Sequence, residues 1–265
     1  MKNFIKHSFN RKTRLAWIAA LLGFGLAVWF GRIDSLPQSA YQLLDPIAPI
    51  TAQDRVMVVA PHQDDDVLGA GGLIQQARSA GAPVKVVWAT DGNKHRLKAE
   101  RESEARSAMS ELGLSKDSLV FLGFRDATLQ NDPNFPAILM AEIEQFKPTI
   151  VVTTLAGDHH PDHAACGEVV GELQQQFGYR AYYFLIHFTN YPQPFGSDRH
   201  SYLLPPLKLI NANNTWRVLP LTKEQLIAKE KALKAYRTQL SLKNPFLKTL
   251  LWSFIRQNEL FLVKE

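Results

Sequence analysis

At 265 residues, the chain fits one α/β domain with additional segments and is long enough to bury a hydrophobic core. It contains 30 Lys and Arg against 25 Asp and Glu, but five of the basic residues lie before residue 15, where the chain has no acidic residue. The rest of the chain is formally neutral, which argues against a nucleic-acid-binding domain, because such a domain needs a basic face. The single cysteine, Cys166, rules out an internal disulfide.

The first segment joins this basic flank, residues 1–14, to an apolar stretch. Residues 15–31 contain no charged residue, and Trp17 and Trp29 lie near the two ends. This pattern predicts a short transmembrane helix with interfacial aromatic residues. Because the positive charges precede it, we expect a cytoplasmic N-terminus and a periplasmic or cell-surface domain. A cleaved signal peptide is the alternative, but no good small-x-small cleavage site follows, which favours an uncleaved anchor.

Residues 32–53 include three prolines and predict a linker, followed by one domain over residues 54–265. From residue 55, short apolar runs alternate with helical patterns. The predicted strands are 56–60, 84–90, 119–122 and 149–154, and the predicted helices are 68–80, 99–112 and 135–146. Repeated strand–helix units predict a Rossmann-like three-layer α/β sandwich with a mainly parallel sheet, preceded by the one transmembrane helix.

The pattern weakens towards the C-terminus. Residues 182–188 predict one more strand, and the proline-rich residues 191–206 predict an elaborated loop. Residues 222–240 predict a helix, in which Thr222 is the N-cap and Gln225 stands at the capping-box position.

Two clusters of His and Asp follow predicted strands. His62 to Asp66 come after the first strand, and Asp158 to His163 come after the fourth. Ligands of open parallel sheets bind beyond the carboxyl ends of the strands, so both clusters are expected at the same rim of the sheet. Asp91 and Asp126, after the second and third strands, are expected at that rim too.

These clusters contain the residue types of a hydrolytic metal site. His62, Asp65 and His163 would make a two-histidine, one-carboxylate set that leaves a position open for water, as in catalytic zinc sites. Asp64 is offset by one residue from Asp65 and can act as a base on that water, while His160 can protonate a leaving amine or stabilise an oxyanion. The same ligand types suit non-haem Fe(II), so zinc is preferred while Fe2+ or another divalent metal stays open.

The two clusters resemble motifs of the PIG-L/LmbE-like family of metal-dependent N-acetylglucosaminyl deacetylases. The first family motif, Pro-His-Pro-Asp-Asp-Glu before a glycine-rich helix start, is similar to Pro61–Gly72. The second, His-Pro-Asp-His, stands intact at His160–His163. The resemblance covers roughly residues 54–262. Gln63 replaces the usual proline and Asp66 the usual glutamate, and neither is a proposed ligand.

The resemblance implies a role for each matching residue. It implies zinc on the three ligands named above and Asp64 as the general base. It also implies that His160 stabilises the oxyanion and acts as the general acid, with Asp162 as its orienting partner. Arg101 and Asp126 match positions that hold the sugar. The implied reaction is hydrolysis of the N-acetyl amide of a 2-acetamido sugar, which releases acetate and a free amine.

Three functions follow from these observations. The first is a membrane-tethered, zinc-dependent N-deacetylase that acts on an amino sugar or glycoconjugate. The second is a metal hydrolase of another ester, phosphoester or amide bond, and the third is a catalytically silent carbohydrate-binding protein. The third is disfavoured because a complete set of ligands, base and acid is present. Asp158 and His159 receive no role, and His187 and Tyr236 are interpreted as structural residues.

Overall fold

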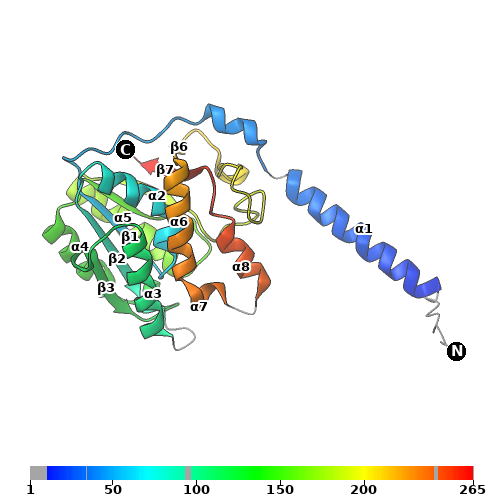
Figure 1. Cartoon of the computed structure of the whole chain (residues 1–265), viewed down its shortest axis with the longest axis horizontal. Coiled ribbons are helices and arrows are strands. Elements are labelled where there is room, and N and C mark those ends of the chain that lie inside the picture. The colour runs from blue at the N-terminus through cyan, green and yellow to red at the C-terminus, as the bar shows by residue number, and fades with distance from the viewer. Residues whose placement is uncertain (1–10, 34, 93–96, 242–243, 265) are drawn as a thin grey trace.

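The computed structural model describes residues 11–33, 35–92, 97–241 and 244–264, so the first ten residues of the basic flank lie outside the described part. Seven strands form one mixed sheet in the order β3-β2-β1-β4-β5-β7-β6 (Figure 1). The first five strands are parallel, and β7 runs antiparallel to both β5 and β6. The strands are β1 (Val56–Ala60), β2 (Val84–Thr90), β3 (Leu119–Phe124), β4 (Ile150–Thr154), β5 (Arg180–Phe184), β6 (Thr215–Pro220) and β7 (Asn258–Lys264).

Helices cover both faces of this sheet. Helix α6 packs against both α2 and α3. The connections β1–α2–β2 and β3–α4–β4 run in opposite directions along the sheet, and right-handed crossovers therefore place their helices on opposite faces. The helices are α1 (Arg11–Ile33), α2 (Asp65–Ser79), α3 (Lys98–Glu111), α4 (Phe135–Phe146), α5 (Pro161–Phe177), α6 (Lys223–Ala235), α7 (Arg237–Leu240) and α8 (Pro245–Trp252).

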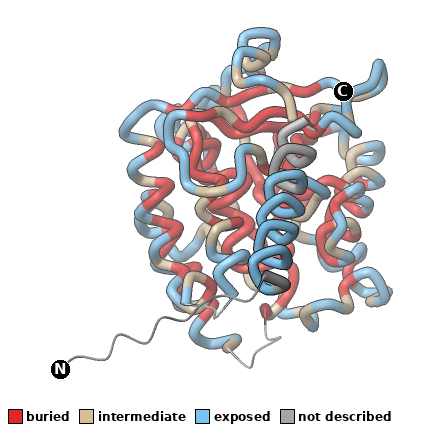
Figure 2. The backbone as a smooth tube through the Cα atoms, turned by 90° about the vertical axis from the view of Figure 1, so that its right-hand side faces the viewer, coloured by how far each residue is buried: buried red, intermediate tan, exposed pale blue. Residues whose placement is uncertain are grey.

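The central strands carry continuous apolar runs because both of their faces are covered. Every residue of β1 and β4 is buried, and Figure 2 shows the buried backbone gathered in the interior of the domain. Strands that are buried on both faces lack the alternation of polar and apolar residues seen in half-exposed sheets. The prediction of a mainly parallel α/β sheet is confirmed, and β1 and β2 have the predicted bounds.

The C-terminal part differs more from the prediction. Strand β5 ends at Phe184, so His187 lies in the following loop and not in a strand. The predicted helix over 222–240 divides at Tyr236 into α6 and α7, although the expected capping box of Thr222 and Gln225 is present. Strands β6 and β7 and helix α8 were not predicted. Strand β7 lies between β5 and β6 in the sheet. The sequence of β7 does not show which strands it pairs with.

Part of the predicted linker is ordered against the domain. The short 3-10 helix η1 (Gln38–Leu43) places Tyr41 on Tyr202, with stacked rings whose centroids are 3.8 Å apart. Ile47 is buried, and its backbone N–H donates to Val218 O at 2.9 Å. These contacts join η1 to the loop that contains Tyr202 and join Ile47 to the sheet edge at β6.

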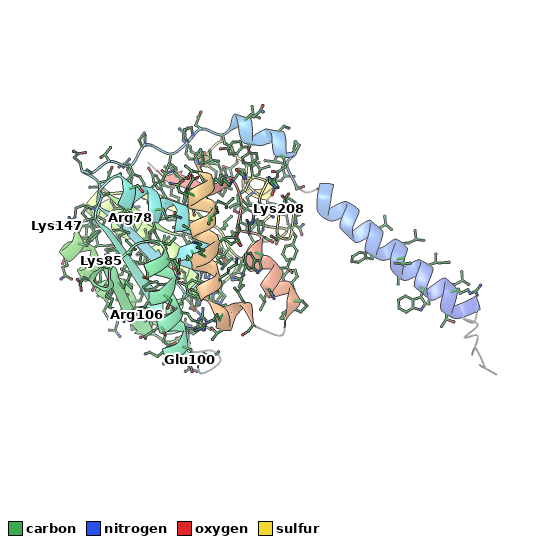
Figure 3. All side chains as sticks on the ribbon, viewed as in Figure 1. Arg78, Lys85, Glu100, Arg106, Lys147 and Lys208 are labelled. Carbon is green, nitrogen blue, oxygen red and sulfur yellow. The ribbon has the colours of Figure 1, made fainter. Side chains whose placement is uncertain are left out.

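Helix α1 extends away from the domain (Figures 1 and 3). The described side chains of residues 13–26 are all exposed, including Trp17 at 61% and Phe24 at 70%. Among the residues that the structure describes, no helix is both long enough and apolar enough to cross a membrane. The transmembrane helix expected at residues 15–31 is therefore not supported.

A buried ion pair joins β7 to α6 and α2. Lys229 Nζ lies 2.6 Å from Glu259 Oε1, and both side chains are almost completely buried. Lys229 also donates to Leu68 O at 2.9 Å, while the Glu259 carboxylate accepts from the backbone N–H groups of Gly72 and Leu73 at 2.6 and 2.9 Å. This pair connects three elements far apart in sequence.

We expect Glu259→Gln to lower the free energy of unfolding by about 3–5 kcal/mol, because it leaves the Lys229 ammonium buried without a counter-charge. Urea denaturation with the midpoint and slope fitted separately measures this loss. The matched control is Glu142→Gln, which removes the partner of Lys85 (labelled in Figure 3) from a more exposed pair, with a distance of 3.2 Å. That change should cost less than about 1 kcal/mol, and equal losses in the two variants would contradict the expectation.

Candidate metal and catalytic site

The site lies where the direction of the sheet connections reverses. Strands β1 and β4 are neighbours, but the chain leaves β1 towards β2 and leaves β4 towards β5. In open α/β sheets this reversal opens a crevice at the carboxyl ends of the two strands. His62 and Asp65 lie between β1 and the first turn of α2, and His163 lies in the first turn of α5. The fold thus brings the two predicted clusters together.

Three donor atoms converge at this crevice. His62 Nδ1 is 3.3 Å from Asp65 Oδ2 and 3.2 Å from His163 Nε2, and the latter is 3.2 Å from Asp65 Oδ2. All three side chains are buried. A tetrahedral ion with bonds of about 2.0–2.1 Å requires ligand atoms about 3.3–3.4 Å apart, so the triangle matches such an ion closely.

The chemistry of the donors also fits a cation. Two imidazole nitrogens and one carboxylate oxygen face one another, and a positive charge at their centre stabilises this arrangement when the nitrogens present their lone pairs. Other possible ligands lie nearby, since the donor atoms of His62, Asp126, His160 and Asp162 are all within 4.8 Å of one another. The donor atoms of His62, His160 and His163 form another such group. The donor set thus supports a divalent metal, and the three predicted ligands lie within 3.2–3.3 Å of one another.

Carboxylates on the far side of each imidazole orient the two histidines. His62 Nε2 lies 3.1 Å from Asp162 Oδ2 and 3.5 Å from Asp126 Oδ1. His163 Nδ1 lies 3.4 Å from Asp158 Oδ2, slightly longer than an ordinary hydrogen bond. A metal-binding histidine generally donates its other N–H to such a carboxylate, which fixes the tautomer and the direction of the ring.

Asp162 contacts His160 and His62 in different ways. Its backbone N–H donates to His160 Nδ1 at 3.3 Å, whereas its carboxylate faces His62. The same carboxylate accepts from the backbone N–H groups of Ala127 and Leu129, at 2.7 and 2.9 Å. Asp162 therefore holds His160 through the backbone, and its side chain ties His62 to the loop after β3.

The neutral form of His160 is suited to donate a hydrogen bond. Burial, together with His62 and His163, lowers the pKa of His160 to about 4. Because Nδ1 accepts from the Asp162 N–H, the proton of the neutral ring must be on Nε2. The Nε2–H group is then available to an oxygen that gains negative charge.

Asp64 is a buried carboxylate beside Asp65. Burial and the charge of Asp65 raise the pKa of Asp64 to about 7, although the guanidinium of Arg101 opposes this. Arg101 Nη2 is 3.6 Å from Asp64 Oδ1. A pKa near neutrality suits a group that takes up and returns a proton.

The two residues implied to hold the sugar occupy different environments. Arg101 is 7% exposed and donates to Gln63 O at 2.7 Å and Gly92 O at 3.2 Å. Two of its nitrogens are thus used to position the loops after β1 and β2. Asp126 has a side chain that is as buried as that of Arg101, and its Oδ1 lies at the crevice, 3.5 Å from His62 Nε2.

Two residues without a predicted catalytic role also belong to this site. Asp158 Oδ2 accepts from the backbone N–H groups of Ile186 and His187, both at 2.9 Å, and so joins the His163 loop to the loop after β5. The His187 ring is 5.0 Å from the His163 ring and 5.6 Å from the His160 ring, between centroids. Ligands of parallel sheets bind beyond the carboxyl ends of the strands. A correct prediction of the end of β5 would therefore have placed His187 among the candidate site residues.

Comparison with known proteins supports the resemblance seen in the sequence. Residues 57–173 match the sequence model of the family described as PIG-L: GlcNAc-PI de-N-acetylase. This segment contains the three donor residues together with Asp64 and His160. The similarity to this family that the two motifs predicted is therefore confirmed over these residues, which make up less than half of the chain.

Curated relatives share about half of the chain. A Bacillus subtilis (strain 168) protein described as a probable N-acetyl-α-D-glucosaminyl L-malate deacetylase 2 is 36% identical over 133 residues, 44% of this chain and 59% of the relative. The diacetylchitobiose deacetylase of Thermococcus kodakarensis is 28% identical over 131 residues, 45% of this chain and 48% of the relative. The chain therefore spans less than two thirds of the length of the curated relatives that it matches.

Solved structures share the fold. A deacetylase of the A40926 pseudoaglycone has a TM-score of 0.61 at 20% identity, covering 80% of this chain and 98% of its own. The N,N'-diacetylchitobiose deacetylase from Pyrococcus horikoshii has a TM-score of 0.57 at 19% identity, covering 87% of this chain and 93% of its own. At these identities the comparison establishes the architecture of the domain.

We expect Asp158→Asn to weaken metal binding by about 10- to 100-fold, because the amide no longer provides a negative acceptor for the His163 Nδ1–H. Competition with a chromogenic chelator measures the affinity. Asp132→Asn, at a carboxylate that contacts only the backbone and side chain of Asn134 among the described residues, is the control and should leave the affinity unchanged. An Asp158→Asn protein that binds metal as tightly as the wild type would show that this carboxylate does not support His163.

Proposed function

We propose that the chain is a zinc-dependent deacetylase that removes the N-acetyl group from an N-acetylglucosamine-type amino sugar or glycoconjugate. The observation that carries the proposal is the triangle of His62, Asp65 and His163 donor atoms, with Asp64 next to it in the chain. The deacetylase names of the curated relatives support the N-acetyl amide as the bond that is cleaved. Zinc is favoured because two imidazoles and one carboxylate are a common catalytic zinc set.

A divalent ion bound by these residues would polarise the amide carbonyl and lower the pKa of a neighbouring water. Asp64 takes the proton from the attacking water, as its pKa near 7 allows. His160 donates a hydrogen bond from Nε2–H to the carbonyl oxygen as that oxygen gains charge. Because the pKa of His160 is low, we assign Asp64 as the group that returns a proton to the departing amine. The products are acetate and a free amine.

Arg101 and Asp126 contribute differently to this proposal. The Arg101 guanidinium is committed to two backbone carbonyls and faces Asp64, so we assign it to positioning the base. Asp126 lies at the crevice beside His62 Nε2, which suits a carboxylate that accepts hydrogen bonds from sugar hydroxyls.

The test is acetate release from N-acetylglucosamine compounds by the zinc-loaded protein. We expect Asp64→Asn to retain its metal, measured by elemental analysis, and to lose turnover by about 10²- to 10⁴-fold, the usual contribution of a general base. His200→Ala, at an exposed histidine, is the control and should keep full activity. No acetate release together with turnover of simple esters would favour the alternative of a hydrolase for another bond, and metal binding without turnover would favour a carbohydrate-binding protein.

We also propose that α1 tethers the domain to a membrane, with the N-terminus in the cytoplasm and the domain periplasmic or at the cell surface. Residues 15–31 carry no charge, and basic residues precede them. The exposed leucines and aromatic residues of α1 gain free energy when a lipid phase covers them, at about 25 cal/mol per Å² of apolar surface.

We expect the full chain to sediment with membranes and the double variant Leu21→Arg, Leu22→Arg to be released, because each charge in an apolar phase costs about 2.5–3.5 kcal/mol. Both leucines are more than 60% exposed. Leu43→Arg in η1, where the leucine is 85% exposed, is the control for the added charge and should leave sedimentation unchanged. A wild-type chain that stays in the supernatant would contradict the tether.

A further inference from the structure

The Asp66 carboxylate is the centre of a buried hydrogen-bond cluster next to the proposed base. Asp66 is completely buried. Tyr236 donates its hydroxyl towards both carboxylate oxygens, 2.9 Å from Oδ1 and 2.7 Å from Oδ2. Trp88 Nε1–H donates to Oδ1 at 3.1 Å, and the backbone N–H of Asp64 donates to the same oxygen at 3.0 Å. The cluster thus connects a tyrosine from the C-terminal region directly to the backbone of Asp64.

The backbone of Asp64 is strained. Its φ is 138° and its ψ is −32°, a region that residues with a Cβ avoid. Such a conformation costs about 1–3 kcal/mol and persists only where the surroundings enforce it. A residue that is free to relax would rotate about φ, and its side chain would move away from the neighbouring Asp65. The strain therefore needs restraints on both sides of Asp64.

Three restraints act on this residue. The carbonyl of the preceding residue, Gln63, accepts from Arg101 Nη2 at 2.7 Å. The Asp64 carbonyl accepts from the N–H groups of Val67 and Leu68, both at 3.0 Å, which begins α2. The Asp64 N–H is held by Asp66 alone among the described residues. The direction of this N–H thus depends on where the Asp66 carboxylate lies.

We propose that Asp66 and Tyr236 form a clamp that holds Asp64 in its strained, reactive conformation, which makes both of them positioning residues for the base. The inference rests on the proposed function only in that it takes Asp64 as the base. The Asp66 Oδ2 accepts from Tyr236 alone among the described residues, so loss of the phenol hydroxyl leaves a buried carboxylate oxygen without a partner. The carboxylate would then rotate to find another donor and release the Asp64 N–H.

The position of Tyr236 explains why the helix divides there. Tyr236 is completely buried, with ψ 61°, and stands between the end of α6 and the start of α7. A straight helix through this residue would carry the phenol in a different direction. Tyr236 also lies beyond residues 57–173, the segment that matches the family model. The C-terminal part of the chain thus supplies the hydroxyl that donates to Asp66.

The decisive variant is Tyr236→Phe, which keeps the ring and removes the hydroxyl. We expect kcat for acetate release to fall about 10- to 100-fold, with KM within about twofold and the metal content unchanged, since neither metal donors nor the substrate lose a contact. The matched control is Tyr179→Phe, at a buried tyrosine just before β5, at the opposite end of the strands from the site, whose hydroxyl donates to Val170 O at 2.6 Å. This control should keep its kcat, whereas an equal loss in both variants would overturn the proposal.

A second measurement separates positioning from a general loss of structure. In an Asp64→Asn background, Tyr236→Phe should cause no further loss of kcat, because the group that it positions is already disabled. If the double variant lowers kcat by the product of the two separate effects, the clamp proposal is overturned.

A crystal structure of Tyr236→Phe supplies a readout independent of turnover. We expect the φ of Asp64 to leave the region near 138° or its N–H to leave Asp66. An unchanged Asp64 in that structure would overturn the proposal. A wild-type protein without acetate release would refute the proposed deacetylase function, and the crystal structure would still decide whether the clamp exists.

Discussion

The site depends on one constraint, the approach of two imidazole nitrogens and one carboxylate oxygen to within 3.2–3.3 Å of one another. At that distance their lone pairs repel unless a proton or a metal cation lies between them. The rest of the site serves to hold them there. Strand β1 ends just before His62, α2 begins at Asp65, and α5 presents His163 from the neighbouring strand connection.

Burial gives neighbouring carboxylates different tasks. Asp64, Asp65 and Asp66 are consecutive and all buried, yet each faces a different set of partners. Asp65 faces two imidazoles, Asp64 faces a guanidinium, and Asp66 accepts from a phenol and an indole. Burial removes the water that would solvate each carboxylate, so each charge depends on its protein partners. A buried charge without a partner costs free energy. In the function that we propose, these three consecutive acidic residues act as the proton carrier (Asp64), a metal ligand (Asp65) and a support for the base (Asp66).

The sequence predicted those features of the site that depend on local order along the chain. His62 and Asp65 are three residues apart at a strand end, and His160 and His163 are three apart at a helix start, so spacing alone suggested a ligand set. Partners that come from distant segments were not predictable in this way. Tyr236 was interpreted as a packing residue, because the carboxylate that it contacts is 170 residues away.

The sequence by itself determined the alternation of strands and helices, the rim on which the chemistry lies and the two clusters that meet there. Buried strands are recognisable in the sequence by short apolar runs, and capped helices are recognisable by their terminal residues. Only the tertiary structure decided which nitrogen of each histidine faces the donor triangle, which carboxylate orients it and how Asp64 is restrained. Those choices depend on distances between side chains from different elements, and a linear pattern contains no such distances.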